Sequence, residues 1–183
     1  MKVFFHHVGH PGAGRDFPRT VFASIPISQV EAAIKADGPI GNQLVRDLAL
    51  QFPSGSFNCW GVPAGAQGVV KDMALGDVVL LVESARIDGV VPALCEVKAF
   101  YPAEFPKLSA ALWGDEKYPY VFFFRTEPLL LPWIEFLDHC GFKENWNPAG
   151  KVFSITPSRL AKHGGAAGYI AFLRKTYSTP VAA

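Results

Sequence analysis

The stretch Leu-Gly-Asp-Val-Val-Leu-Leu-Val, residues 75–82, decides the fold class of this chain of 183 residues. Its Gly-Asp pair is a turn signal. The apolar run Val78–Val82 that follows is too short for a stable helix and contains β-branched valines, which favours a buried strand. Asp88-Gly89 then marks a tight turn, and Val90–Phe100 has the pattern of a long second strand. Because a turn joins these two strands, we expect them to pair antiparallel.

Outward from this hairpin, the sequence predicts strands and helices that are mixed without regular alternation. The further expected strands are Val3–Val8, Ser56–Val62, Tyr120–Arg125 and Phe153–Ile155. The expected helices are one opened by a capping box at Ser28 and Glu31, one after Pro39, two over Glu104–Leu112 and Pro132–Cys140, and a terminal one carrying Tyr169–Tyr177. This mixture predicts an α+β fold, a curved sheet or small barrel with helices packed outside it. We expect one domain over residues 1–177, with residues 178–183 as a flexible tail or the start of a linker.

Composition and charge exclude several classes of protein. Half of the residues are hydrophobic, so a core can form, and the net charge of +1 excludes a protein that holds nucleic acid by bulk charge alone. The three cysteines are widely spaced and form no C-x-x-C motif, so neither a disulfide framework nor a zinc site is expected. The N-terminus lacks the apolar core of a signal peptide, and no apolar run is long enough to span a bilayer. A cytoplasmic protein is the expectation.

The sequence motifs that would bind a cofactor or a metal, or supply catalytic groups, are incomplete. Gly9–Gly14 is interpreted as a loop whose glycine spacing differs from the dinucleotide-binding fingerprint, and no cofactor is expected. His6 and His10 would share one strand face without further metal ligands, so no metal is expected. Cys59 lies on an expected strand and is interpreted as a core residue. Asp115 and Glu116 are neighbours in a polar loop, so no general acid and base are assembled and a non-catalytic protein is expected.

The tryptophans are the strongest functional signal. Trp60 and Trp113 each precede a glycine near the boundary of an expected element. A single tryptophan most often packs in the core, because it carries much apolar surface. Two Trp-Gly pairs at strand edges instead suggest the two walls of an aromatic slot. Trp133 and Trp146, in or after a late helix, are interpreted as core or lid residues.

An ordered set of segments carries a family resemblance. Cys59–Val62, Leu75–Leu81, Cys95–Val97 and Trp113 followed by Tyr118–Phe124 resemble the EVE and YTH domains of the PUA-like superfamily. The set is especially similar to the N-terminal DNA-reading domains of modification-dependent restriction systems of the McrBC type, and the resemblance covers most of the chain. It implies a pseudo-barrel with flanking helices and a pocket in which aromatic side chains sandwich a modified base.

The resemblance also implies roles for individual residues. The base-binding cage would consist of Trp60 and Trp113 as its two walls, with Tyr118 or Tyr120 closing it. The Asn residues that read the base edge in YTH domains have no clear counterpart near Ser24; the contacts expected instead are Asn58 first and Asp115 second, with Ser24 as a further candidate. The expected phosphate contacts are Arg15, Arg19, Lys117 and Arg125.

The expected function is non-catalytic recognition of a modified, methylated base in nucleic acid, with DNA favoured over RNA and with any nuclease or motor activity in a partner domain or subunit. Stacking contributes about 1–3 kcal/mol per base, which can offset the few kcal/mol needed to flip a base out of a duplex. A buried methyl group adds only about 0.8 kcal/mol, roughly a fourfold preference, so stronger discrimination needs contacts to the polar edge.

One alternative is an RNA-binding or RNA-cleaving domain of the related ASCH type, with a cluster around Lys117 and Tyr118. Another is an interaction module whose tryptophans are buried.

Overall fold

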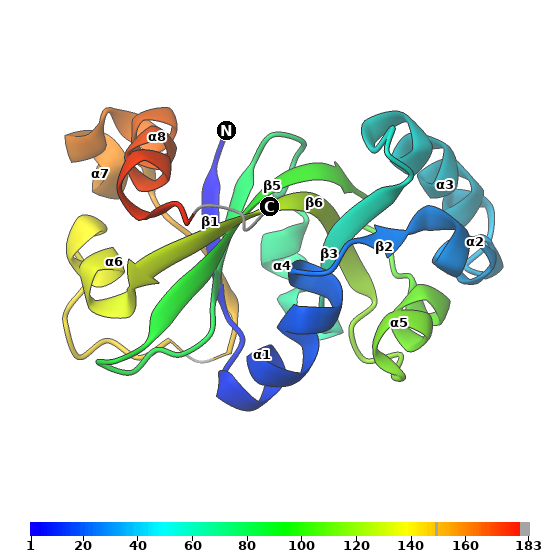
Figure 1. Cartoon of the computed structure of the whole chain (residues 1–183), viewed down its shortest axis with the longest axis horizontal. Helices are drawn as coiled ribbons and strands as arrows, with labels where there is room; N and C mark the ends of the chain where they lie inside the picture. Colours follow the sequence, from blue (N-terminus) through cyan, green and yellow to red (C-terminus); the bar gives the residue numbers. More distant parts are fainter. Residues whose placement is uncertain (149, 180–183) are drawn as a thin grey trace. The chain divides into compact units, whose positions relative to one another are not determined.

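The computed structural model describes residues 1–148 and 150–179, and the chain divides into two compact units (Figure 1). The first unit comprises Met1–Arg15, Gly76–Glu96 and Thr126–Ala183, and the second comprises Asp16–Leu75 and Val97–Arg125. The chain passes between them after Arg15, after Leu75, and within strands β5 (Val90–Phe100) and β6 (Tyr120–Pro132). The expectation of one domain over residues 1–177 stays a prediction, and residues 180–183 of the expected tail lie outside the described residues.

The first unit is built on strands in the order β6-β5-β4-β1-β7. Strand β1 (Val3–His7) pairs parallel with β4 (Val78–Val82) and antiparallel with β7 (Val152–Ser154), while β4 pairs antiparallel with β5. The helices of this unit are α1 (His10–Asp16, whose last residue belongs to the second unit), α6 (Trp133–His139), α7 (Pro157–Leu160), η3 (Ala161–His163) and α8 (Gly165–Tyr177).

The second unit is built on strands in the order β2-β3-β6-β5. Strand β3 (Ser56–Val62) pairs antiparallel with the short β2 (Ile25–Pro26) and with the first half of β6, where Trp60 lies opposite Phe122. Its helices are η1 (Phe17–Val21), α2 (Ile27–Ala36), α3 (Pro39–Gln51), η2 (Ala64–Ala66), α4 (Gln67–Val70) and α5 (Pro106–Trp113).

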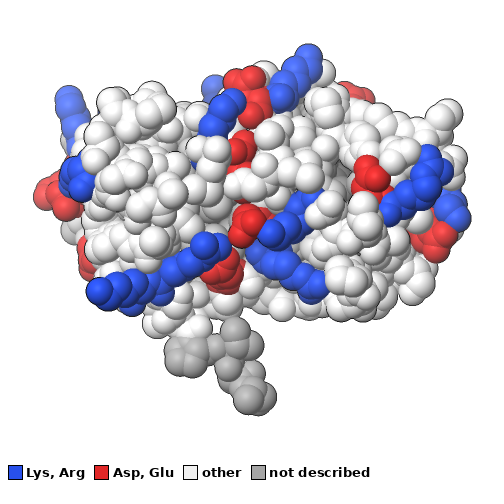
Figure 2. Space-filling view, turned by 90° about the horizontal axis from the view of Figure 1, so that it is seen from above, with Lys and Arg blue, Asp and Glu red and all other residues white. Residues whose placement is uncertain are grey.

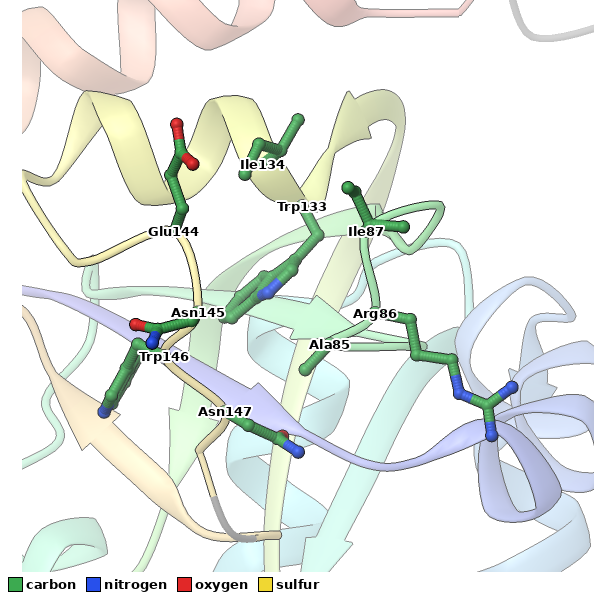
Figure 3. A pocket seen from close by; sticks show the side chains of 9 residues that line it. All are labelled: Ala85, Arg86, Ile87, Trp133, Ile134, Glu144, Asn145, Trp146 and Asn147. Carbon is green, nitrogen blue, oxygen red and sulfur yellow. The ribbon is translucent and has the colours of Figure 1, made fainter.

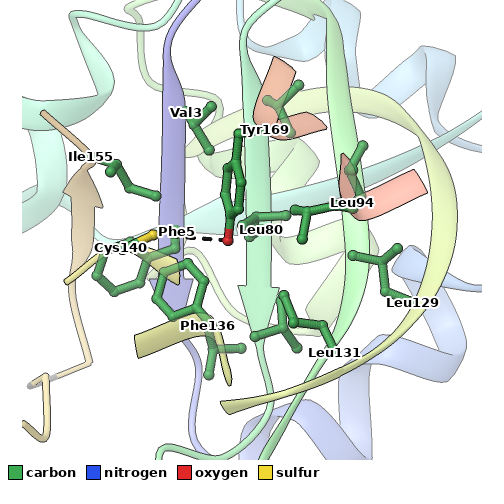
Figure 4. Close-up of a cluster of buried hydrophobic side chains, with 14 of the residues drawn as sticks. Val3, Phe5, Leu80, Leu94, Leu129, Leu131, Phe136, Cys140, Ile155 and Tyr169 are labelled. Carbon is green, nitrogen blue, oxygen red and sulfur yellow. Dashed lines mark hydrogen bonds between the residues drawn. The ribbon is translucent and has the colours of Figure 1, made fainter. Parts of the chain in front are cut away.

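Each unit has its own hydrophobic core. In the first unit, side chains of β1, β4, β5 and β6 pack against α6 and α8, as Figure 4 shows for Phe5, Leu80, Phe136 and Tyr169. In the second unit, one face of β3 and β6 packs against α2, α3 and α5; the buried residues there include Phe57, Cys59, Val121 and Phe123. The alternation of strand side chains therefore leaves Trp60 and Phe122 on the other face of this part of the sheet.

The α+β fold and the central hairpin are confirmed, with β4 and β5 spanning the residues expected for them. Strand β6 is longer than expected and continues to Pro132. Its second half alternates, since Leu129 and Leu131 are buried whereas Leu130 is 66% exposed. The parallel pairing of β1 with β4 was not expected from a pattern of turn-linked strands.

Two local expectations were wrong. Gly9–Gly14 is not a loop, because helix α1 begins at His10, with a hydrogen bond of 3.0 Å from the Ala13 amide to the Gly9 carbonyl. Ala13 is buried, which explains how a glycine-rich segment is held helical. Helix α2 begins at Ile27 with Pro26 as its N-cap, so Ser28 lies inside the helix and makes no capping hydrogen bond.

None of the helices in the described part of the chain combines the length and the apolar character needed to cross a lipid bilayer.

Candidate functional site

The aromatic residues of the second unit form one connected group, which we call the Trp60 cluster: Phe17, Trp60, Trp113 and Tyr118. Phe17 opens η1, Trp60 lies on β3, Trp113 ends α5, and Tyr118 precedes β6. The ring centroids of Trp60 and Trp113 are 6.2 Å apart with an interplanar angle of 67°. Tyr118 meets Trp113 at 5.9 Å and 79°, and Phe17 meets Trp60 at 5.1 Å and 79°. Every contact in the cluster is therefore edge to face, the favoured geometry for packed aromatic rings.

The expected slot between Trp60 and Trp113 is closed in this structure. The next residue along β3, Gly61, faces the sheet surface opposite to that of Trp60. Trp113 covers that surface so closely that a Cβ atom on Gly61 would lie 2.6 Å from Cζ3 of Trp113. The two indoles thus approach β3 from opposite faces and touch. A base sandwiched between two rings needs them parallel and about 7 Å apart, twice the rise between stacked bases.

Exposure differs sharply among the four expected cage residues. Trp60 is 6% exposed and Tyr120 is 2% exposed, whereas Trp113 and Tyr118 are half-buried. The Tyr120 hydroxyl donates a hydrogen bond of 3.1 Å to Glu104, and burial together with this bond raises the pKa of Tyr120. Trp113 and Tyr118 are therefore the two more exposed cage candidates, although the indole nitrogen of Trp113 is buried, and the ring of Trp60 contacts that of Trp113.

The loop between Trp113 and Tyr118 is held by a serine. The Ser109 hydroxyl donates to the carbonyl of Asp115 at 2.5 Å and accepts from the amide of Tyr118 at 3.1 Å. The left-handed Gly114, with φ of 77°, ends α5 just before this loop. These contacts position Trp113 and Tyr118 beside one another.

Asp115 is present as a carboxylate. Its side chain pairs with the ammonium group of Lys117 and accepts a hydrogen bond of 3.0 Å from the Lys117 amide. The hydrogen bond from the Lys117 side chain is the main cause that lowers the pKa of Asp115. Asp115 can therefore only accept hydrogen bonds, as an edge contact to an amino group of a base requires.

Asn58, the other strong candidate for an edge contact, is engaged within the second unit. Its side-chain amide donates a hydrogen bond of 2.9 Å to the Ala23 carbonyl, and the residue is buried. Asn58 thereby fixes the position of the neighbouring Ser24, which is exposed. In this structure Asn58 holds the segment after η1 in place, and Ser24 is the more accessible of the two.

The four expected phosphate contacts have different neighbours. Arg19 donates to the carbonyl of Leu112 at 3.0 Å, so it lies beside the Trp60 cluster, and its side chain stays 53% exposed. Lys117 lies in the loop of that cluster. Arg125 instead donates to Ser54 at 2.7 Å and lies over the ring of Phe52. Arg15 is exposed and belongs to the first unit.

The surface charges have both signs. On the face that Figure 2 shows, Lys and Arg side chains lie next to Asp and Glu side chains rather than forming one broad basic surface. This agrees with the net charge of +1 and with a protein that does not bind polyanions by bulk charge.

The first unit contains a cavity that the sequence analysis missed (Figure 3). We call it the Trp146 pocket. It has a volume of about 370 Å³ and is lined by Ala85, Arg86, Ile87, Trp133, Ile134, Glu144, Asn145, Trp146 and Asn147. Trp133 is a core residue, as expected, whereas Trp146 is only partly buried. The run Glu-Asn-Trp-Asn at residues 144–147, in which polar side chains flank a tryptophan, was the available signal for this pocket.

Catalytic and metal-binding groups are not evident in the described residues. Cys59 is a free, fully buried thiol whose pKa is raised by burial, so it is a core residue, as expected. Lys117 and Tyr118, the residues of the ribonuclease alternative, are engaged with Asp115 and Trp113, respectively. Across residues 1–148 and 150–179, no group of three or more His, Cys, Asp or Glu side chains could hold a metal ion.

No protein-family model and no curated protein sequence matches this chain. Among solved structures, the chain is similar to the N-terminal domain of McrB from Thermococcus gammatolerans, which was solved bound to m5C DNA. The TM-score is 0.69 at 18% sequence identity, and the match covers 96% of this chain and 98% of that domain. The chain therefore has the fold of the McrB N-terminal domain, and the α+β fold expected from the sequence is confirmed.

Proposed function

We propose that this protein is a non-catalytic reader of modified bases in DNA. The observation that carries the proposal is the fold, which matches over 96% of the chain a domain that was solved bound to m5C DNA. The small net charge supports it as well, because weak attraction to phosphates leaves most of the affinity to contacts with the base.

The flipped base stacks on the ring surface that Trp113 and Tyr118 present. Both rings are half-buried, and the hydrogen bond from the Tyr118 amide to Ser109 holds the backbone of Tyr118, so little conformational entropy is lost at Tyr118 when a base stacks on its ring. Trp60 supports the edge of Trp113. Stacking on one ring contributes about 1–3 kcal/mol, comparable with the few kcal/mol that flipping a base costs.

A complete cage requires that Trp113 moves away from Trp60. Closed edge-to-face packing leaves no room for a guest between the two indoles. Trp113 is the mobile partner in this proposal, because it ends a helix, precedes a left-handed glycine and is half-buried, whereas Trp60 lies within a strand. Opening would replace the ring contact by stacking on both faces of the base.

Polar contacts then decide which base is read. The Asp115 carboxylate accepts from an exocyclic amino group, and Ser24 can contribute a hydroxyl. Arg19 and Lys117 lie near enough to the cluster to contact the flanking phosphates. Chemistry on the DNA would be performed by a partner domain or subunit with nuclease or motor activity.

The test is a binding titration with a panel of matched oligonucleotides. DNA duplexes and single strands that carry 5-methylcytosine, N6-methyladenine or no modification are compared with RNA of the same sequence. We expect a preference for one modified DNA of at least about fourfold, the value that burial of a methyl group supplies. Equal affinity for every DNA in the panel, or a preference for RNA, would refute the proposal.

Variants separate the site from the rest of the surface. Trp113→Ala should abolish the preference, whereas Trp113→Phe should keep part of it because a ring remains. Leu130→Ala is the matched control, since Leu130 is an apolar residue that is 66% exposed in the first unit. A Trp113→Ala variant that keeps the full preference would show that the base is read elsewhere.

A further inference from the structure

The Trp146 pocket combines an aromatic surface with polar side chains on loops. Trp146 is stacked on Phe142 on one side, with ring centroids 4.4 Å apart and an interplanar angle of 12°. It lies 6.3 Å from the nearly parallel Trp133, whose buried indole N–H has no acceptor among the described residues. Asn145 and Asn147 add exposed carboxamides on either side of Trp146.

A second recess adjoins this pocket. It has a volume of about 230 Å³ and shares Ala85, Arg86 and Asn147 with the Trp146 pocket. The remaining lining includes His7, Gly9 and Ser84. Figure 3 shows the Arg86 guanidinium extending away from the two indoles. We call the two adjoining recesses the trough: Trp133 and Trp146 line only the first recess, whereas Arg86 lines both.

Charges of opposite sign lie in different parts of the trough. Glu144 lines the Trp146 pocket, above Trp146 and across from Arg86 in Figure 3. Within the part of the chain that the structure describes, the Arg86 guanidinium has no ion-pair partner, and the side chain is exposed. A ligand with a flat apolar part, hydrogen-bonding edges and one anionic group would lie with its anion toward Arg86 and its flat part toward Trp146.

We propose that this trough binds one nucleotide of an unpaired strand, distinct from the modified base, with its base against Trp146 and its phosphate at Arg86. The chemistry matches each part of a nucleotide: an indole face for stacking, two carboxamides and a carboxylate for the base edges, and a guanidinium for the phosphate. Any base has a face that can stack, so this site does not depend on the modification. The inference rests on the proposed binding of nucleic acid by this chain.

The test uses a labelled, unmodified single-stranded oligothymidylate and fluorescence anisotropy. Arg86→Ala should weaken binding about tenfold, as the loss of one charge-assisted phosphate contact does. It should also reduce the slope of log K against log salt by about 0.7, the value for one phosphate on a single strand. Lys175→Ala removes an equal charge from the exposed face of α8 and is the matched control.

Two further variants guard against a folding artefact. Asn147→Asp places a negative charge in the trough without removing apolar contacts, and it should weaken binding while leaving the urea midpoint unchanged. Trp146→Phe should retain more affinity than Trp146→Ala, since a ring remains for stacking. If Arg86→Ala and Asn147→Asp both bind oligothymidylate as Lys175→Ala does, the trough is not a nucleotide site.

The two proposals fail in different ways. Arg86→Ala should lower the affinity for modified and unmodified single-stranded DNA by the same factor and leave the ratio of the two affinities intact. Trp113→Ala should remove the ratio and leave the affinity for oligothymidylate intact. Suppose that the wild-type protein shows no preference for modified DNA but Arg86→Ala still weakens oligothymidylate binding tenfold. That result would refute the proposed reading of modified bases and support the nucleotide site.

Discussion

The Trp60 cluster and the Trp146 pocket contain the same kinds of ring in opposite arrangements. In the Trp60 cluster all rings meet edge to face, and Trp60 itself is 6% exposed. In the Trp146 pocket the two indoles are nearly parallel, at 21°, and border a cavity of about 370 Å³. The rings of the Trp60 cluster leave no space between them, whereas the Trp146 pocket leaves space beside its indoles.

The difference shows that tryptophans in a sequence do not by themselves define a binding site. A ring can accept a guest only where one face remains uncovered, and this depends on which neighbours pack against it. In the Trp60 cluster, Gly61 lets Trp113 approach β3 so closely that the indoles touch. In the Trp146 pocket, Phe142 covers one face of Trp146, and the loop at Ala85–Ile87 lines the pocket from another side.

The largest expected contrast is in stability. Trp60→Ala should lower the free energy of unfolding by about 3–5 kcal/mol, the usual cost of truncating a buried tryptophan. Trp146→Ala should cost clearly less, because Trp146 is only partly buried. Urea unfolding followed by circular dichroism measures both values. Equal losses of unfolding free energy in the two variants would contradict the distinction between the closed Trp60 cluster and the open Trp146 pocket.

Acidification should destabilise the first unit by protonating histidine, because this unit contains every histidine of the chain. Burial, with a smaller contribution from His7, lowers the pKa of His6 to about 4 from the ordinary 6.5. The folded protein therefore keeps His6 neutral, while the unfolded chain takes up a proton below about pH 6.5. Stability should fall by about 3 kcal/mol as the pH falls from 6.5 to 4.

Urea unfolding of the wild type and of His6→Leu across this pH range checks that expectation. The variant should lose less stability on acidification, because the group that takes up the proton on unfolding is gone. Parallel pH profiles for the two proteins would show that His6 does not govern the response.

Gly61→Ala tests the closed contact itself. The added Cβ would lie 2.6 Å from the Trp113 ring and 2.8 Å from the Tyr118 carbonyl, so side chain or backbone must shift. We expect a loss of about 1–3 kcal/mol in the free energy of unfolding, the typical cost of overpacking. A change in tryptophan fluorescence should accompany it, since Trp113 is displaced. Wild-type stability and fluorescence would mean that Trp113 does not rest on β3.

The smallest effect is expected at Lys117. Its ion pair with Asp115 is exposed, so Lys117→Ala should leave the urea midpoint unchanged. If Lys117 contacts a phosphate of duplex DNA, the same variant should reduce the salt dependence of binding by about 0.9 in the log–log slope. Lys35→Ala, which removes a lysine from another exposed ion pair in the second unit, is the control.

Local sequence patterns predicted the strands that lie at the centre of the fold. Val78–Val82 and Val90–Phe100 were predictable because buried, β-branched runs next to turn residues allow few alternatives. The parallel pairing of β4 with β1 was not predictable, because it depends on contacts between residues far apart in the sequence. Helix α1 was missed because its glycines oppose a helix, and the burial of Ala13 is visible only in the folded chain.

The candidate site was predictable in its residue types more than in its geometry. The family resemblance grouped Trp60, Trp113 and Tyr118, and their rings contact one another in the structure; their role in binding a base stays a prediction. It could not indicate that Trp113, far along the chain, rests on the Gly61 surface of β3 and meets Trp60 edge to face. The Trp146 pocket was missed because Arg86 and Asn147 are far apart in sequence and meet only in the folded first unit.

The most direct test of the central claim is whether a base leaves the duplex and stacks on Trp113. A duplex with 2-aminopurine next to the modified base reports this, because its fluorescence rises when its neighbour is flipped out. We predict a rise with the wild-type protein that is larger for modified than for unmodified DNA and is absent for Trp113→Ala. Saturated binding of modified DNA with no rise in fluorescence would contradict the claim.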